Sequence, residues 1–292
     1  MSASPWQSYW QSHSTHNSFM HEYESGEGPY GVIVRYWQSL FNTLPINAVV
    51  ADLGAGNGAL SHLFIKHVPS PQCNAWHNID YAQIQAPRAH PCITHTQADM
   101  HALPFADSSI DVVVSMYGIE YSDLSRTLSE VYRVLKTGGQ CVFVMHHPKS
   151  IITKQSKITL NVLNNVLQAP MLNGLHDIQF TSVDDLKSYC LQVLTSYLRQ
   201  GPENEQEDVK LIGQNVFNIL QSTASLVDLI HQLALLGQGM ADHAQRLSQQ
   251  IEAAQQVAHI QSIDMPFGVT NMKLTTLDFA GTPIAFTLIA NK

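Results

Sequence analysis

The acidic residue Asp52 is followed by three glycines at alternate positions, Gly54, Gly56 and Gly58. The apolar residues before Asp52 predict a buried strand, and the apolar residues 59–64 predict a helix that begins directly afterwards. A strand, a tight turn and a helix in this order is how α/β proteins hold a nucleotide-like ligand. Glycine suits the turn because a side chain would block the backbone from the ligand, and because tight turns need unusual φ and ψ.

Two classes of ligand are compatible with this loop. The spacing Gly54-x-Gly56-x-x-Ala59 satisfies the dinucleotide fingerprint, so a dinucleotide oxidoreductase is one interpretation. Asp52, however, places a carboxylate at the strand tip, where an anionic pyrophosphate gains nothing from it. A ligand with an ammonium group is attracted by this carboxylate, and S-adenosylmethionine (SAM) carries both an ammonium and a sulfonium. We therefore favour SAM over a dinucleotide.

Later segments agree with this choice in order and spacing. The chain resembles the class I SAM-dependent methyltransferases over residues 30–147 and its last strands, and in particular the type 11-like branch with an L-P-F signature, here Leu103-Pro104-Phe105. The resemblance implies that Asp80 takes both ribose hydroxyls, that Asp99 accepts from the adenine amine, and that the backbone N–H of Met100 meets the ring. It implies SAM as cofactor and S-adenosylhomocysteine (SAH) as product. The implied cofactor-binding residues are Asp52, Leu53, Gly54, Ala55, Gly56, Gly58, Asp80, Tyr81, Asp99, Met100 and Ser115.

The alternation of strands and helices over residues 46–145 predicts an α/β fold. With the resemblance, we expect a seven-stranded, mostly parallel, Rossmann-like sheet whose last strand is antiparallel. The sixth and seventh strands are expected at residues 269–279 and 283–290. Between the fifth and sixth strands, we expect a helical insertion. Its predicted helices cover residues 182–198, 203–221, 224–236 and 240–259, with breaks at Gly201-Pro202 and at Gly237-Gln238-Gly239.

Three parts of the chain are thus expected. Residues 1–45 form an N-terminal helical arm, which the resemblance places over the cofactor. Residues 46–147 and 266–292 form the SAM-binding core. Residues 148–265 form the insertion, and its two candidate roles are a lid over the acceptor and a surface for homodimerisation.

Composition narrows the choice of partners and compartment. The 292 residues carry a net charge of −8, which opposes nonspecific binding to nucleic acid. No apolar run approaches the ~20 residues of a membrane helix, and the N-terminus lacks the pattern of a secretory signal. The four cysteines include no C-x-x-C pair, and the histidines show no metal-ligand spacing. We expect a reduced, soluble, cytoplasmic protein without a metal, a nucleic-acid partner or a membrane partner.

Methyl transfer from SAM is an in-line displacement with a neutral leaving group, so the enzyme mainly supplies alignment and desolvation. An alcohol or phenol needs a base, whereas a carboxylate needs little help. Candidate bases follow the expected fourth and fifth strands, and histidine is the first choice because it titrates in the useful range. The candidates are Tyr117, Glu120, Tyr121, His146 and His147.

The leading hypothesis is a SAM-dependent methyltransferase (EC 2.1.1.-) that acts on a small-molecule acceptor. The alternative is a SAM-binding protein that no longer transfers methyl groups and acts as a regulatory or partner subunit. The dinucleotide oxidoreductase comes third, because Asp52 and Asp99 both argue against it.

Overall fold

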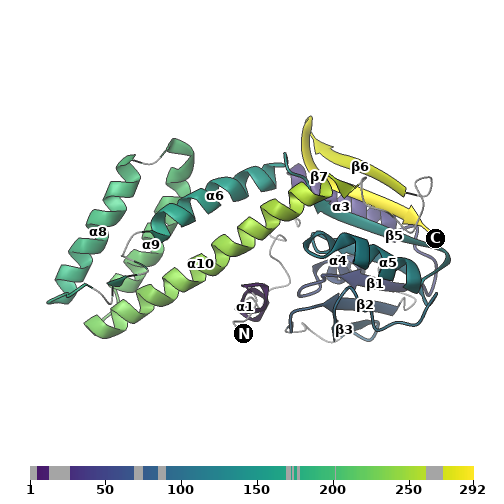
Figure 1. The fold of residues 1–292 in the computed structure, drawn as a ribbon, viewed down its shortest axis with the longest axis horizontal. Helices are drawn as coiled ribbons and strands as arrows, with labels where there is room; N and C mark the ends of the chain where they lie inside the picture. The colour runs from purple at the N-terminus through teal and green to yellow at the C-terminus, as the bar shows by residue number, and fades with distance from the viewer. Residues whose placement is uncertain are drawn as a thin grey trace. The chain divides into compact units, whose positions relative to one another are not determined.

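A computed structural model describes residues 5–12, 27–68, 75–84, 90–168, 172, 174–175, 178–200, 202–260 and 272–292. Its α-helices are α1 (Pro5–Ser12), α3 (Gly28–Phe41), α4 (Ala59–His67), α5 (Leu124–Val134), α6 (Ile151–Leu167), α8 (Val183–Gln200), α9 (Gln206–Leu220) and α10 (Leu226–Val257) (Figure 1). The 3-10 helices that lie wholly on described residues are η1 (Ile119–Tyr121) and η3 (Glu203–Glu205). The strands are β1 (Val49–Leu53), β2 (Ala75–Asp80), β3 (Ile93–Gln97), β4 (Ile110–Met116), β5 (Leu135–His146), β6 (Met272–Phe279) and β7 (Thr282–Asn291).

The chain divides into two compact units. One comprises Met1–Thr153 with Glu252–Lys292, and the other comprises Lys154–Ile251. The sheet belongs to the first unit, and the second unit is helical. Among the described residues, no helix is both long and apolar enough to span a membrane.

Within the described residues, seven strands form one sheet in the order β3-β2-β1-β4-β5-β7-β6. Neighbours from β3 to β5 are parallel, and β7 is antiparallel to both β5 and β6. The predicted fold class is confirmed, although residues 269–271 of the expected sixth strand lie outside the described residues. The strand order reverses between β1 and β4, and in open α/β sheets a ligand binds outside the carboxyl ends of the strands at such a point.

Helices cover both faces of the sheet, so that its central strands are buried on both sides. On one face, α5 packs Leu128 and Val131 against strand residues such as Ala51 and Phe143. On the other face, α3 and α4 pack aromatic and aliphatic side chains against the remaining strand positions, and the largest buried one is Trp37. This alternation of contacts along each strand follows from the two-residue period of strand side chains.

The helical unit differs from the prediction at one point. Two helices were expected over residues 224–236 and 240–259, but α10 runs without a break from Leu226 to Val257. Glycine in a helix costs only about 1 kcal/mol relative to alanine, and buried side chains such as Leu229, Leu233 and Leu247 anchor α10 in the core of this unit. Gly237 also has a packing role, because a Cβ there would lie 2.5 Å from the carbonyl oxygen of Leu172.

The two glycines of α10 provide a matched test of that role. Gly239→Ala should stabilise the protein by up to about 1 kcal/mol, since nothing lies within 4 Å of the added Cβ. Gly237→Ala should instead destabilise it by about 1–3 kcal/mol, because the methyl group collides with the Leu172 backbone. Urea denaturation of both variants measures the difference. Equal stabilisation by the two substitutions would contradict the packing at Gly237.

The cysteines differ in part from the expectation of a reduced chain. Cys92 is disulfide-bonded, so that expectation is wrong at this residue. Cys141 and Cys190 are free and buried, and burial raises their thiol pKa values to about 12 and about 11. Both free thiols therefore stay protonated near neutral pH and act as small apolar core residues.

Candidate functional site

The glycine loop after β1 is built on left-handed backbone. Gly54, Gly56 and Gly58 have φ angles of 66°, 51° and 83°. Residues with a side chain rarely adopt such positive φ angles. The space that each glycine leaves is filled by the protein itself. A Cβ would lie 2.8 Å from the Gly118 backbone at Gly54, 2.5 Å from the Trp10 ring at Gly56, and 2.7 Å from the Asn78 side chain at Gly58. The predicted tight turn is confirmed, and Gly118, Trp10 and Asn78 pack against it.

Asp80, at the tip of β2, holds this loop in place. Its Oδ2 accepts a hydrogen bond from the Gly56 N–H and its Oδ1 accepts one from the Ala82 N–H, both at 2.8 Å. The side chain is nearly buried, and burial raises the pKa of the carboxyl, while the backbone donors at Ala82 and Gly56 lower it in part. A carboxylate pinned at a strand tip in this way has a fixed position toward any ligand above the sheet.

Asp52, at the tip of β1, is more deeply buried. It is 1% exposed, and its Oδ2 has no hydrogen-bond partner within the part of the chain that the structure describes. Burial raises the pKa of this carboxyl well above its ordinary value, and the neighbouring charge of Asp80 raises it further. Two buried carboxyl groups side by side form a site that favours a cation.

Asp99 and Met100 follow β3, the third strand tip. The Asp99 Oδ1 accepts from the His101 N–H at 2.8 Å and lies 2.9 Å from His101 Nδ1. About half of the Asp99 side chain remains exposed, so that it can still accept from a ligand. The imidazole of His101 was not among the predicted site residues.

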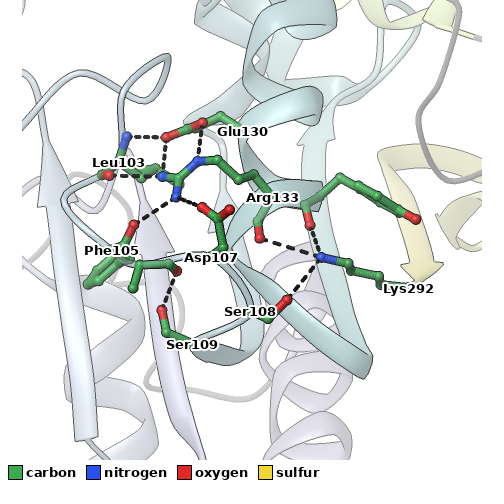
Figure 2. A network of polar contacts seen from close by, with 10 residues as sticks. Leu103, Phe105, Asp107, Ser108, Ser109, Glu130, Arg133 and Lys292 are labelled. Carbon is green, nitrogen blue, oxygen red and sulfur yellow. Dashed lines mark hydrogen bonds and ion pairs between the residues drawn. The ribbon is translucent and has the colours of Figure 1, made fainter.

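The Leu103-Pro104-Phe105 segment beyond this corner is fixed by one arginine of α5 (Figure 2). The Arg133 guanidinium donates to the carbonyl oxygens of Leu103 and Phe105 and to the carboxylates of Asp107 and Glu130. Glu130 in turn accepts from the Leu103 N–H at 2.8 Å. This network ties the loop to α5 and so supports the corner at Asp99.

Arg133→Lys should loosen that loop, because a lysine ammonium cannot make the fork of contacts that a guanidinium makes. We expect a loss of about 1–3 kcal/mol in the free energy of unfolding and a several-fold weaker affinity for SAM. Arg126→Lys is the matched control, since Arg126 lies exposed on the same helix. Chemical denaturation and calorimetric titration measure the two effects. Equal behaviour of both variants would contradict the anchoring role of Arg133.

A cavity of about 680 Å³ opens over these strand tips. Of the residues singled out in the sequence, it is lined by Gly54, Asp80, Tyr81, Asp99, Met100, Tyr117 and Tyr121. Residues that were not predicted individually complete the lining: Trp6, Gln7, Trp10, Ala82, Gln97, His101, Gly118 and Ser122. The other predicted cofactor residues, Asp52, Leu53, Ala55, Gly56, Gly58 and Ser115, do not line it. The Ser115 hydroxyl donates to the Leu53 carbonyl and accepts from the Ile119 N–H, which braces β1 against η1.

The N-terminal helix α1 closes one side of the cavity. Gln7 bonds the backbone of Gln83 through both ends of its amide, at 3.1 and 2.8 Å. Trp6 packs edge-on against Tyr121 at 5.1 Å between ring centroids, and Trp10 lies over Gly56. The aromatic residues of this segment were visible in the sequence, but no periodic pattern indicated which of them would reach the loop.

The candidate bases occupy distinct places. Tyr117 follows β4 with a φ of 56°, which is uncommon for a residue with a side chain and recurs at functional sites. His146 is buried against Tyr117 and pairs with Glu120 at 2.7 Å. His147 points to the other face of the sheet, where it packs against Phe286 at 4.2 Å between ring centroids. The structure therefore brings Tyr117, Glu120 and His146 together and leaves His147 apart.

The sequence profile of the methyltransferase domain family matches residues 51–143. A malonyl-[acyl-carrier protein] O-methyltransferase of Methylococcus capsulatus is 34% identical over 104 residues, which cover 34% of this chain and 38% of that protein. A ubiquinone/menaquinone biosynthesis C-methyltransferase of Hydrogenovibrio crunogenus is 27% identical over 165 residues, 54% of this chain and 61% of that protein. The chain thus spans less than two thirds of the length of these relatives. A solved SAM-dependent methyltransferase of Mesorhizobium loti is 26% identical, with a TM-score of 0.33, and the match covers 39% of this chain and 54% of that one.

Proposed function

We propose that this chain, which belongs through residues 51–143 to the class I SAM-dependent methyltransferases, transfers the methyl group of SAM to a small-molecule acceptor in line with the breaking C–S bond. The observation that carries the proposal is the convergence of Asp80 and Asp99 on one cavity, with the buried Asp52 on the strand next to that of Asp80. These three side chains come from the tips of three neighbouring strands. SAM is the cofactor of this family, and SAH is its product.

The proposed roles are those that the family resemblance implies, assigned to the side chains as the structure describes them. Asp80 is fixed by two backbone donors and accepts from the ribose hydroxyls. Asp99 and the backbone N–H of Met100 receive the adenine edge. Asp52, buried at the end of the strand before the glycine loop, supplies negative charge that attracts the ammonium of the methionine moiety. Asp80 and Asp99 provide acceptors and the Met100 N–H provides a donor, and these three residues line the cavity.

A small acceptor is supported by the cavity and by the charge of the chain. The volume of about 680 Å³ lies in the ordinary range for small-molecule sites. The net charge of −8 opposes a nucleic-acid substrate. The names of the two relatives, a malonyl-[acyl-carrier protein] O-methyltransferase and a quinone biosynthesis C-methyltransferase, agree with a small methyl-accepting group.

One experiment distinguishes this proposal from the alternative, a SAM-binding protein without transferase activity. The purified protein is incubated with methyl-labelled SAM and the low-molecular-mass fraction of a cell extract. Our proposal expects labelled small molecules to accumulate together with SAH. Stoichiometric binding of SAM without any transfer of label would favour the non-catalytic function.

A further inference from the structure

A buried carboxylate and imidazole lie next to the cavity. Glu120 is 1% exposed and His146 is 2% exposed. One oxygen of the carboxylate, Oε1, lies 2.8 Å from the backbone nitrogen of His146 and 2.7 Å from its imidazole Nδ1. A carboxylate that reaches both the backbone and the ring of one histidine fixes the orientation of that ring.

These two contacts favour one tautomer of the imidazole. The backbone N–H can only donate, so Oε1 is an acceptor toward it. An ionised Glu120 can only accept from the imidazole as well, and Nδ1 then carries a hydrogen. In the neutral ring, Nε2 is then left with a lone pair and no hydrogen.

Nε2 of His146 is buried and has no hydrogen-bond partner among the described residues. The same holds for Oε2 of Glu120. An unsatisfied buried polar atom costs about 1–3 kcal/mol, so that two of them on one bonded pair call for an explanation. A ligand that brings a donor to Nε2 provides one.

The rings around the imidazole belong to the cavity wall. Tyr117 lies 4.4 Å and Tyr121 5.9 Å from the His146 ring, between ring centroids, and both tyrosines line the cavity. Among the described residues, these two tyrosines connect the imidazole to the cavity wall. Catalytic hydrogen bonds are often long or poorly aligned in a ligand-free site and tighten only in the complex. The proposal below therefore requires a tyrosine ring to move when the acceptor binds.

We propose that the methyl acceptor is a small phenol and that His146, oriented by Glu120, is the base that takes its hydroxyl proton. This inference rests on the proposed methyltransferase function. A flat ring fits a cavity lined by Trp6, Trp10, Tyr117 and Tyr121, because aromatic rings stack favourably with one another. A carboxylate acceptor would have no use for the base.

The atoms balance in a single displacement. A lone pair of the phenol oxygen forms the new bond to the methyl carbon while the C–S bond breaks, and its electron pair stays on sulfur, giving neutral SAH. The hydroxyl proton passes to Nε2 of His146, and Glu120 stabilises the resulting imidazolium. The products are the methyl ether, SAH and a protonated histidine, which then returns its proton to water.

The first test uses 4-hydroxybenzoate with SAM, because this probe offers a phenol and a carboxylate in one molecule; phenol, catechol and benzoate complete the panel. We expect methyl ethers and no methyl esters by mass spectrometry. His146→Gln should lower kcat/KM by at least about 100-fold, with SAH affinity retained. His147→Gln is the matched control and should keep the wild-type rate. Methyl esters as the product, or a wild-type rate in His146→Gln, would overturn the proposal.

The pH profile separates a base from a structural histidine. Among the described residues, the charged and titratable groups that face the imidazole are Glu120 and Tyr121 from η1 and Tyr117, which follows β4. In the wild type, kcat/KM should rise with pH as one proton is lost, and in Glu120→Gln that rise should shift to lower pH. If neither Glu120→Gln nor His146→Gln changes the pH dependence of kcat/KM, the assignment of His146 as the base is contradicted.

Nitrogen NMR of histidine-labelled protein decides the question even if no panel member is methylated. SAH binding is measured first, and its absence would refute the proposed function itself. In the SAH complex, we expect His146 with hydrogen on Nδ1, and we expect its ring signals to shift when catechol is added while those of His147 stay. A hydrogen on Nε2 of the neutral ring, or no response to catechol, would overturn this inference alone.

Discussion

Asp80→Ala should weaken the affinity for SAH by about 100-fold or more. Hydrogen bonds to a charged group contribute about 1.5–3 kcal/mol each, and two ribose hydroxyls lose their shared acceptor. The loss of about 3 kcal/mol corresponds to this factor. The substitution also frees the Gly56 and Ala82 N–H groups, which the carboxylate holds at 2.8 Å, so that the glycine loop loses its tether.

Asp80→Asn distinguishes these two contributions. The amide oxygen can still accept from one backbone donor, but the negative charge is gone. We expect an affinity between those of the wild type and Asp80→Ala, with the unfolding temperature close to that of the wild type. Calorimetric titration with SAH and thermal unfolding measure the two quantities. Wild-type affinity in Asp80→Ala would refute the ribose assignment.

Asp52→Asn should have opposite effects on binding and on stability. Asp52 does not line the cavity, so its charge acts on SAM at a distance, and removing that charge should weaken SAM binding by about tenfold. The same change removes a buried carboxyl whose pKa is raised by burial and by Asp80, so the ligand-free protein should become more stable. Each kcal/mol gained should raise the unfolding temperature by about 2–4 °C.

The effect of pH on this variant has a definite sign. A group whose folded pKa is raised contributes its stability below its unfolded pKa and loses it as pH rises through the folded value. The wild type should therefore approach Asp52→Asn in stability near pH 4, close to the ordinary carboxyl pKa of 3.8, and fall behind it toward neutral pH. Thermal unfolding across this range measures the gap. If the stability difference between the two proteins narrowed as pH rises, the ionised Asp52 would not be destabilised by burial.

Binding should depend on pH in the complementary direction. SAM is a cation at this site, so it favours the ionised forms of Asp52 and Asp80, whose pKa values are both raised in the free protein. Affinity for SAM should thus increase with pH, and protons should be released on binding. The two buried carboxyl groups lower stability in the absence of ligand, and the cofactor offsets that cost when it binds.

The sheet could be predicted from the sequence because its signals are local. A few consecutive residues are enough to indicate each element. This holds for the apolar run before Asp52, for the glycines after it, and for the strands around Ile110 and Cys141. The single helix α10 could not be predicted, because Gly237 and Gly239 look like a helix break. The contact that explains Gly237 comes from Leu172, some 65 residues away along the chain.

The site shows the same division between local and distant information. The acidic residues at the strand tips could be singled out because each lies within two residues of the end of its own strand. The closure of the cavity by Trp6 and Trp10 depends on how α1 packs, which no pattern within α1 specifies. Ser115 was expected at the cofactor, yet its hydroxyl bonds Leu53 and Ile119 of the protein itself. The pairing of Glu120 with His146 joins residues 26 positions apart and required the sheet to bring them together.

Calorimetric titration of the wild-type protein with SAH, and separately with an oxidised nicotinamide dinucleotide, tests the central claim most directly. The carboxylates at the three strand tips predict a single SAH site per chain near neutral pH and no heat with the dinucleotide. Binding of the dinucleotide, with no heat from SAH, would contradict the account.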